Sequence, residues 1–174
     1  MFEKSVEELT ELGAQITTAE IAQQPELWRD TLNIYRENKE AIEAFLAEAR
    51  AMGEGRLSVV FTGAGTSDYV GDTCAPYLRH AGNTDLYDFK PIATTDIVSA
   101  PRDFLRAEDP TLVVSFARSG NSPESLAAVA VAKELVHNVK FLNITCAPEG
   151  KLAVESVDDP NALTLLIPRA NDKG

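Results

Sequence analysis

The chain has 174 residues, enough to bury a core without disulfides or a structural metal. Hydrophobic residues make up 44% and charged residues 25% of it, an ordinary balance for one globular domain. The formal net charge of −11, with no local basic cluster, argues against nucleic acid or an anionic membrane as a partner.

The first predicted element is a long amphipathic helix over residues 18–52. Apolar and aromatic residues recur there at spacings of three and four, with charged residues between them. This apolar face consists of Trp28, Leu32, Tyr35, Ile42, Phe45, Leu46 and Ala49. Gly53 and Gly55 follow, as is typical of a helix end. We treat residues 1–52 as an N-terminal helical segment that packs against the core or a partner subunit.

Beyond residue 52 the pattern changes to strands that alternate with helices. Apolar runs predict five strands, at residues 57–61, 86–92, 111–116, 140–145 and 163–167. Helices are predicted at residues 67–80, kinked or shortened by Pro76, and at residues 123–136. The alternation predicts an α/β fold, a three-layer sandwich with helices on both faces of a five-stranded parallel sheet. Residues 53–174 are expected to form this domain.

Two polar turns follow strands of this predicted sheet. Residues 63–67, Gly-Ala-Gly-Thr-Ser, come after the first strand, and residues 117–122, Ala-Arg-Ser-Gly-Asn-Ser, come after the third. Each turn leads into a predicted helix, and Ser122 and Pro123 suit an N-cap and a first helical residue. In parallel sheets, ligands bind beyond the carboxyl ends of the strands, where the strand order reverses. We therefore expect the two turns to face one crevice.

The residue types in these turns favour a phosphate ester. Helix N-termini attract anions, hydroxyls and an arginine donate hydrogen bonds to phosphate oxygens, and glycines let the backbone approach the ligand closely. The predicted phosphate-binding residues are Gly65, Thr66, Ser67, Arg118, Ser119, Gly120, Asn121 and Ser122. We infer a phosphate monoester, on a sugar, as the ligand.

Other nucleotide and hydrolase motifs fit less well. A dinucleotide-binding fingerprint needs a third glycine where this chain has Asp68. No Gly-Lys-Ser/Thr sequence is present for a Walker loop, and residues 117–121 lack both glycines of a nucleophile elbow. His80 and His137 are the only histidines, which makes a serine triad or a zinc centre improbable.

The two cysteines, Cys74 and Cys146, have no metal-ligand spacing and cannot form a disulfide framework. We expect them to be small buried hydrophobic residues. No metal and no cofactor is predicted. No apolar leader and no segment of membrane-spanning length is seen in the sequence, so we expect a cytoplasmic protein with no membrane partner.

At the two turns the sequence resembles the sugar isomerase (SIS) domain family. Residues 65–67 match the family's Gly-Thr-Ser turn, and residues 118–122 match most of its Ser-x-Ser-Gly-x-Thr/Ser turn. Ala117 stands where the family usually has a serine, so that hydroxyl is lost. Residues 20–25 and 151–156 extend the resemblance, which covers roughly residues 20–170. The turn variants most resemble the tagatose-6-phosphate ketose/aldose isomerase and galactosamine-6-phosphate deaminase-isomerase subgroup.

The resemblance implies a flavodoxin-like five-stranded SIS domain that binds a phosphosugar. It also implies an aldose–ketose 6-phosphate isomerase, of the tagatose-6-phosphate or amino-sugar deaminase-isomerase type, in a homo-oligomer. Members of that subgroup carry two SIS domains, with the acid–base residues mainly beyond the first. The chain is thus expected to be the first domain of a longer protein, and its catalytic residues are unknown. The alternative is a non-catalytic phosphosugar sensor, although the acidic N-terminal segment offers no DNA-recognition helix.

Overall fold

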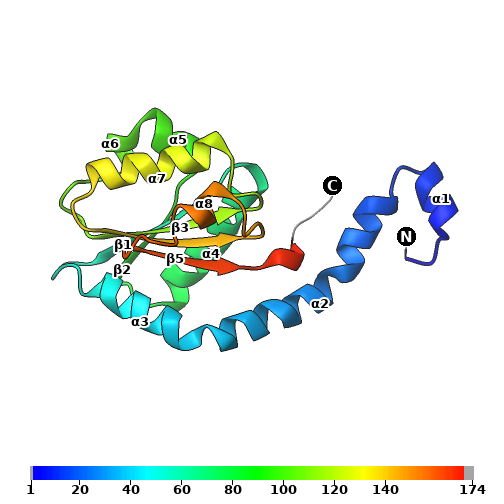
Figure 1. The fold of residues 1–174 in the computed structure, drawn as a ribbon, viewed down its shortest axis with the longest axis horizontal. Coiled ribbons are helices and arrows are strands. Elements are labelled where there is room, and N and C mark those ends of the chain that lie inside the picture. The colour runs from blue at the N-terminus through cyan, green and yellow to red at the C-terminus, as the bar shows by residue number, and fades with distance from the viewer. Residues whose placement is uncertain (1, 171–174) are drawn as a thin grey trace.

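A five-stranded, all-parallel sheet forms the middle layer of the molecule. The computed structural model describes residues 2–170 (Figure 1). The strands lie in the order β2-β1-β3-β4-β5. Their bounds are Leu57–Thr62 for β1, Tyr87–Pro91 for β2, Thr111–Ala117 for β3, Val139–Thr145 for β4 and Ala162–Leu166 for β5. The predicted strands and their parallel arrangement are confirmed, with ends that differ by one residue.

Helices lie on both faces of this sheet (Figure 1). One face carries α5 (Thr94–Ser99), α6 (Pro101–Phe104), α7 (Pro123–Leu135) and α8 (Lys151–Val154), and the other carries α3 (Lys39–Arg50) and α4 (Asp68–Ala81). Two short 3₁₀ turns, η1 (Gly65–Ser67) and η2 (Pro168–Ala170), follow β1 and β5. The α/β sandwich expected from the sequence is confirmed.

The N-terminal segment contains three helices rather than one. A long helix is confirmed as α2 (Gln15–Glu37), but it ends well before residue 52 and a separate α3 follows. Asn38 divides them with φ −103° and ψ 7°, and its side-chain amide donates to the Ile34 carbonyl at 2.8 Å. A side chain that bonds the backbone in this way competes with the regular helix. The short α1 (Val6–Glu11) was missed, although Ser5 and Glu8 form a reciprocal capping box.

The helix α4 continues through Pro76 to Ala81, so the expected shortening at this proline is not observed. The reason is tertiary packing. Ala75 is fully buried, and a Cβ on Gly71 would lie 2.9 Å from the Phe61 Cβ atom. The close approach of α4 to β1 therefore holds the helix in place around the proline.

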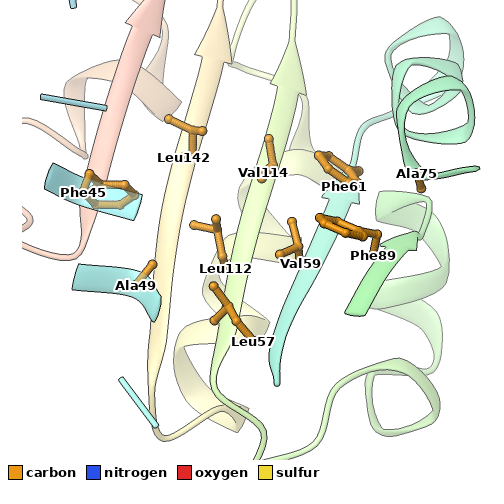
Figure 2. Packing of buried hydrophobic residues seen from close by; sticks show 10 residues of the cluster. All are labelled: Phe45, Ala49, Leu57, Val59, Phe61, Ala75, Phe89, Leu112, Val114 and Leu142. Carbon is orange, nitrogen blue, oxygen red and sulfur yellow. The ribbon is translucent and has the colours of Figure 1, made fainter. Parts of the chain in front are cut away.

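Alternation along the strands divides the core into two layers. The layer between the sheet and α3 and α4 is shown in Figure 2, and it consists of Phe45, Ala49, Leu57, Val59, Phe61, Ala75, Phe89, Leu112, Val114 and Leu142. Between α3 and α4 this face has an apolar hollow of about 330 Å³. The other layer packs against α5 and α7 and contains Val60, Ile97, Val113, Ala128 and Phe141.

We expect Val60→Ala to lower the free energy of unfolding by about 2 kcal/mol, because it removes two buried methyl groups from a close-packed layer. Val60 is 0% exposed. Urea denaturation followed by circular dichroism measures this difference. Val157→Ala is the matched control, because Val157 is 77% exposed. Equal effects of the two substitutions would contradict the core assignment.

Candidate functional site

The two predicted turns lie side by side because β1 and β3 are neighbouring parallel strands. Thr62 pairs with Ser115 in the register of these strands. The turn after β1 and the turn after β3 therefore leave the sheet at the same edge. The chain passes from β1 outward to β2, and then back across β1 to β3 on the other side. This is the point of strand-order reversal at which parallel α/β sheets bind ligands.

A cavity of about 410 Å³ opens at this edge. Residues that follow β1, β3, β4 and β5 line it, together with side chains from the ends of β3 and β4. They are Ala64, Thr66, Ser67, Val70, Phe116, Ala117, Arg118, Ile144, Cys146, Ile167 and Ala170. The cavity thus has a polar side formed by the two turns and an apolar side formed by the strand ends. Such a division suits a ligand with one charged end.

Three of the predicted phosphate-binding residues, Thr66, Ser67 and Arg118, line the cavity. The others lie in the same two turns but outside its lining. These are Gly65, Ser119, Gly120, Asn121 and Ser122. The structure therefore brings both turns to one site, while it gives several of their side chains other contacts.

Tight backbone contacts define the first turn. A Cβ on Gly63 would lie 2.5 Å from the Ser67 carbonyl carbon, so only glycine fits there. The Thr94 backbone N–H and hydroxyl both donate to the Gly63 carbonyl, at 3.0 and 3.1 Å. Gly65 has φ +58°, in the left-handed region that favours glycine. Ser67 occupies the N-cap position of α4, but its side chain makes no capping hydrogen bond.

The second turn is held by the segment that begins α8. A Cβ on Gly150 would lie 2.2 Å from the Ser119 carbonyl oxygen, which is closer than any real contact. The Leu152 N–H donates to the Gly120 carbonyl at 3.0 Å. The Lys151 N–H donates to the Asn121 side-chain oxygen at 3.0 Å. Asn121 thus connects the turn to α8, a contact that the sequence analysis did not foresee.

Two serine hydroxyls of this turn also have partners, one in the turn itself and one in the first turn of α7. Ser122 occupies the N-cap position of α7 as predicted, but its hydroxyl donates to the Ser125 hydroxyl at 2.7 Å rather than accepting from the backbone. The Ser119 hydroxyl accepts from the Asn121 N–H at 3.3 Å. A phosphate bound through these hydroxyls would have to replace or share those bonds.

The end of β4 supports the second turn from below. The Thr145 hydroxyl and the Cys146 N–H both donate to the Arg118 carbonyl, at 3.3 and 3.2 Å. The predicted burial is confirmed for Cys146, whereas Cys74 is only half-buried. Gly150 and Thr145 were missed by the sequence analysis. The Pro-Glu-Gly sequence that ends at Gly150 was the only local signal of a tight turn.

Charge near the site is mixed. Arg118 is the charged side chain among the residues that line the cavity, in a chain with a net charge of −11. At the start of α4, burial raises the pKa of Asp68, and the neighbouring Asp72 and Asp96 raise it further. One Asp68 carboxyl oxygen is buried with no hydrogen-bond partner within residues 2–170. An anion at this edge would therefore need local donors that outweigh a repulsive field.

Proteins of similar sequence include D-galactosamine-6-phosphate deaminases named AgaS. One from Streptomyces coelicolor, described as putative, is 47% identical over 160 residues, which is 91% of this chain and 40% of that protein. One from a Shewanella species is 42% identical over 164 residues, 94% of this chain and 42% of that protein. No family model matches the chain.

A solved structure agrees with these relatives. It is described as a putative tagatose-6-phosphate ketose/aldose isomerase from Clostridium novyi, is 43% identical, and has a TM-score of 0.86 over 98% of this chain and 42% of that one. The chain belongs to the SIS domain family. The chain spans about 40% of the length of the curated relatives that it matches. No group of three or more histidine, cysteine or acidic residues within residues 2–170 is placed to hold a metal ion.

We expect Gly150→Ala to lower the free energy of unfolding by about 1–3 kcal/mol, because the added methyl group displaces the turn at Ser119. Thermal denaturation measures the loss. Gly55→Ala is the matched control, since a Cβ there meets no atom within 4 Å. A Gly150→Ala protein as stable as the Gly55→Ala protein would contradict the close contact.

We expect Asp68→Asn to raise the melting temperature at pH 7. The pKa of Asp68 is higher in the folded protein than in the unfolded chain, where it is about 4. Above that pH, ionisation of Asp68 therefore lowers the stability of the folded state. The gain should shrink as the pH falls toward that value and vanish below it, where the carboxyl is protonated in both states. Asp85→Asn, at an exposed aspartate before β2, is the control. A lower melting temperature for Asp68→Asn at pH 7 would show that the negative charge stabilises the N-terminus of α4 instead.

Proposed function

We propose that this SIS chain binds a sugar phosphate as the phosphosugar-binding part of an aldose–ketose 6-phosphate isomerase. The activity would be of the tagatose-6-phosphate or amino-sugar deaminase-isomerase type. The observation that carries this proposal is the cavity at the carboxyl edge of the sheet, where Thr66, Ser67 and Arg118 face apolar strand ends. The names of the relatives, deaminases and isomerases of hexose 6-phosphates, support the same substrate class.

The part played by this chain is binding and positioning. Backbone N–H groups at the start of a helix, two hydroxyls and a guanidinium offer hydrogen bonds to a dianionic phosphate. A phosphate held at one end of an open-chain sugar fixes the position of the other end, where isomerisation moves a proton between C1 and C2. That step requires a general base, for which a carboxylate is the expected group. We assign no residue of this chain to it.

We further propose that residues 53–174 form the first of two SIS domains in a longer protein, preceded by the helical segment of residues 1–52. The supporting fact is that the relatives are about two and a half times as long as the matched region, since this chain covers 40% of them. The acid–base residues would then lie outside this chain.

A homo-oligomer is proposed from the exposed apolar face of α2. The α3 part of the predicted apolar face packs into the core, through Ile42, Phe45 and Ala49. The α2 part of that face does not. Trp28 is 63% exposed and Leu32 is 53% exposed. A partner subunit that covers this face would remove that area from water.

We also propose a cytoplasmic location, consistent with a phosphorylated substrate. No helix in the described part of the chain has the length and hydropathy to span a membrane.

We expect hexose and hexosamine 6-phosphates to raise the melting temperature of the 174-residue chain, and the same sugars without phosphate to leave it unchanged. Ligand that binds only the folded state stabilises it in proportion to the logarithm of ligand concentration. Ser67→Ala is expected to weaken this effect, with a loss of affinity of about tenfold or more, because it removes a hydrogen bond to a charged group. A thermal-shift titration provides both measurements.

Ser99→Ala is the matched control for this titration. Ser99 is exposed at the end of α5, and its hydroxyl donates to the Asp96 carbonyl at 3.3 Å, away from the cavity. The proposal is wrong for this chain if phosphorylated and unphosphorylated sugars give equal shifts. It is also wrong if Ser67→Ala and Ser99→Ala bind the phosphorylated sugars equally well.

A further inference from the structure

A row of four polar side chains crosses the sheet just below the candidate site. Thr62 pairs with Ser115, Ser115 with Asn143, and Asn143 with Thr164 in the register of neighbouring strands. Three of these residues, Thr62, Ser115 and Asn143, are at most 3% exposed. Such a row within a core is costly unless its polar atoms are hydrogen-bonded. Asn143 is the informative member.

The hydrogen bonds around Asn143 run in one direction. The Ser156 hydroxyl donates to the Ala153 carbonyl at 2.8 Å. Its single proton is thus in use, so the contact of 2.6 Å between Ser156 and Thr164 must be a bond donated by Thr164. The Asn143 amide nitrogen in turn donates to the Thr164 hydroxyl at 3.4 Å. The chain of donors begins at Asn143, whose Oδ1 atom has no partner within residues 2–170 although the residue is 2% exposed.

A small cavity of about 30 Å³ lies beside Asn143. It is bounded by α7, α8 and the strands β4 and β5, and its lining includes Leu126, Val129, Leu152 and Ser156. Lys133 and Asp159 also line it, and they form an ion pair of 2.6 Å. That hydrogen bond holds the pKa of Asp159 below its usual range. The cavity thus combines apolar walls, a buried acceptor and a charged pair.

We propose that this cavity is an internal binding site for one ordered water molecule, held by Asn143 Oδ1 and Ser156 Oγ. The cavity has room for a water molecule, and Asn143 and Ser156 in its lining supply the two polar partners that a buried water needs at the least. The water donates one proton to Asn143 Oδ1 and the other to the remaining lone pair of Ser156 Oγ. Glu155 and Asp159 also line the cavity, but Asp159 is paired with the Lys133 ammonium group, and no acidic cluster within residues 2–170 is placed to hold a metal ion. An apolar occupant would leave the Asn143 acceptor unsatisfied.

The position of this water gives it a structural role in the site. Ser156 follows α8, and the second turn is held by Gly150, just before this helix, and by Lys151 and Leu152 at its start. Asn143 lies on β4, two residues before Thr145, which bonds the Arg118 carbonyl. A water bound by both Asn143 and Ser156 therefore connects the segment after α8 to β4, close to the second turn.

Nuclear magnetic resonance of the labelled 174-residue chain tests the proposal. Cross-relaxation between water and the methyl groups of Leu126, Val129 and Leu152 is expected, with opposite signs of the laboratory-frame and rotating-frame effects, as for an internal water. Asn143→Leu should abolish these cross-peaks because it removes the acceptor. It retains the Ser156 and Thr164 hydroxyls, whose exchanging protons are the main competing source of such signals.

Two further variants keep the outcome decisive. Val129→Ile keeps Asn143 but adds about one methylene to the cavity wall, so it should displace the water even if Asn143→Leu folds poorly. Thr62→Val is the matched control, because the Thr62 hydroxyl is also buried without a partner in the described chain but does not line this cavity. It should leave the cross-peaks unchanged. Absence of the cross-peaks in the parent protein, or their persistence in both Asn143→Leu and Val129→Ile, would overturn the proposal.

Discussion

The parallel, in-register pairing of β1 with β3 is the constraint on which the rest of this structure depends. It places Thr62 beside Ser115, and so the turns that follow these two strands leave the sheet next to each other. The meeting of the two turns follows from this neighbour relation. The cavity, its hydroxyls and its arginine come from segments more than fifty residues apart, and only the sheet brings them together.

Close backbone contacts then give each turn its shape. Gly63 lets the first turn fold back on Ser67, and Gly150 lets the start of α8 approach Ser119. A glycine has no side chain with which to contact a ligand, yet a methyl group at either position would collide with backbone atoms. Binding residues in such a site depend on neighbours that act only through their small size.

Sequence reasoning recovered the parts of the fold with long, periodic patterns. The five strands and the helices α4 and α7 emerge from apolar runs, because burial in a parallel sheet requires them. It missed α5, α6 and α8, which have four to six residues each and too little periodicity to be recognised. It also joined α2 and α3, because the break falls at a single residue, Asn38, whose side chain bonds the Ile34 carbonyl.

The sequence by itself determined that this protein is a parallel α/β domain with two hydroxyl-rich turns after its first and third strands, because strand burial and helix starts leave local patterns. Only the tertiary structure decided which turn residues face the cavity. Thr66, Ser67 and Arg118 do, whereas Asn121 is bonded to Lys151. That difference depends on the position of α8, a contact between segments about thirty residues apart, which no local pattern encodes.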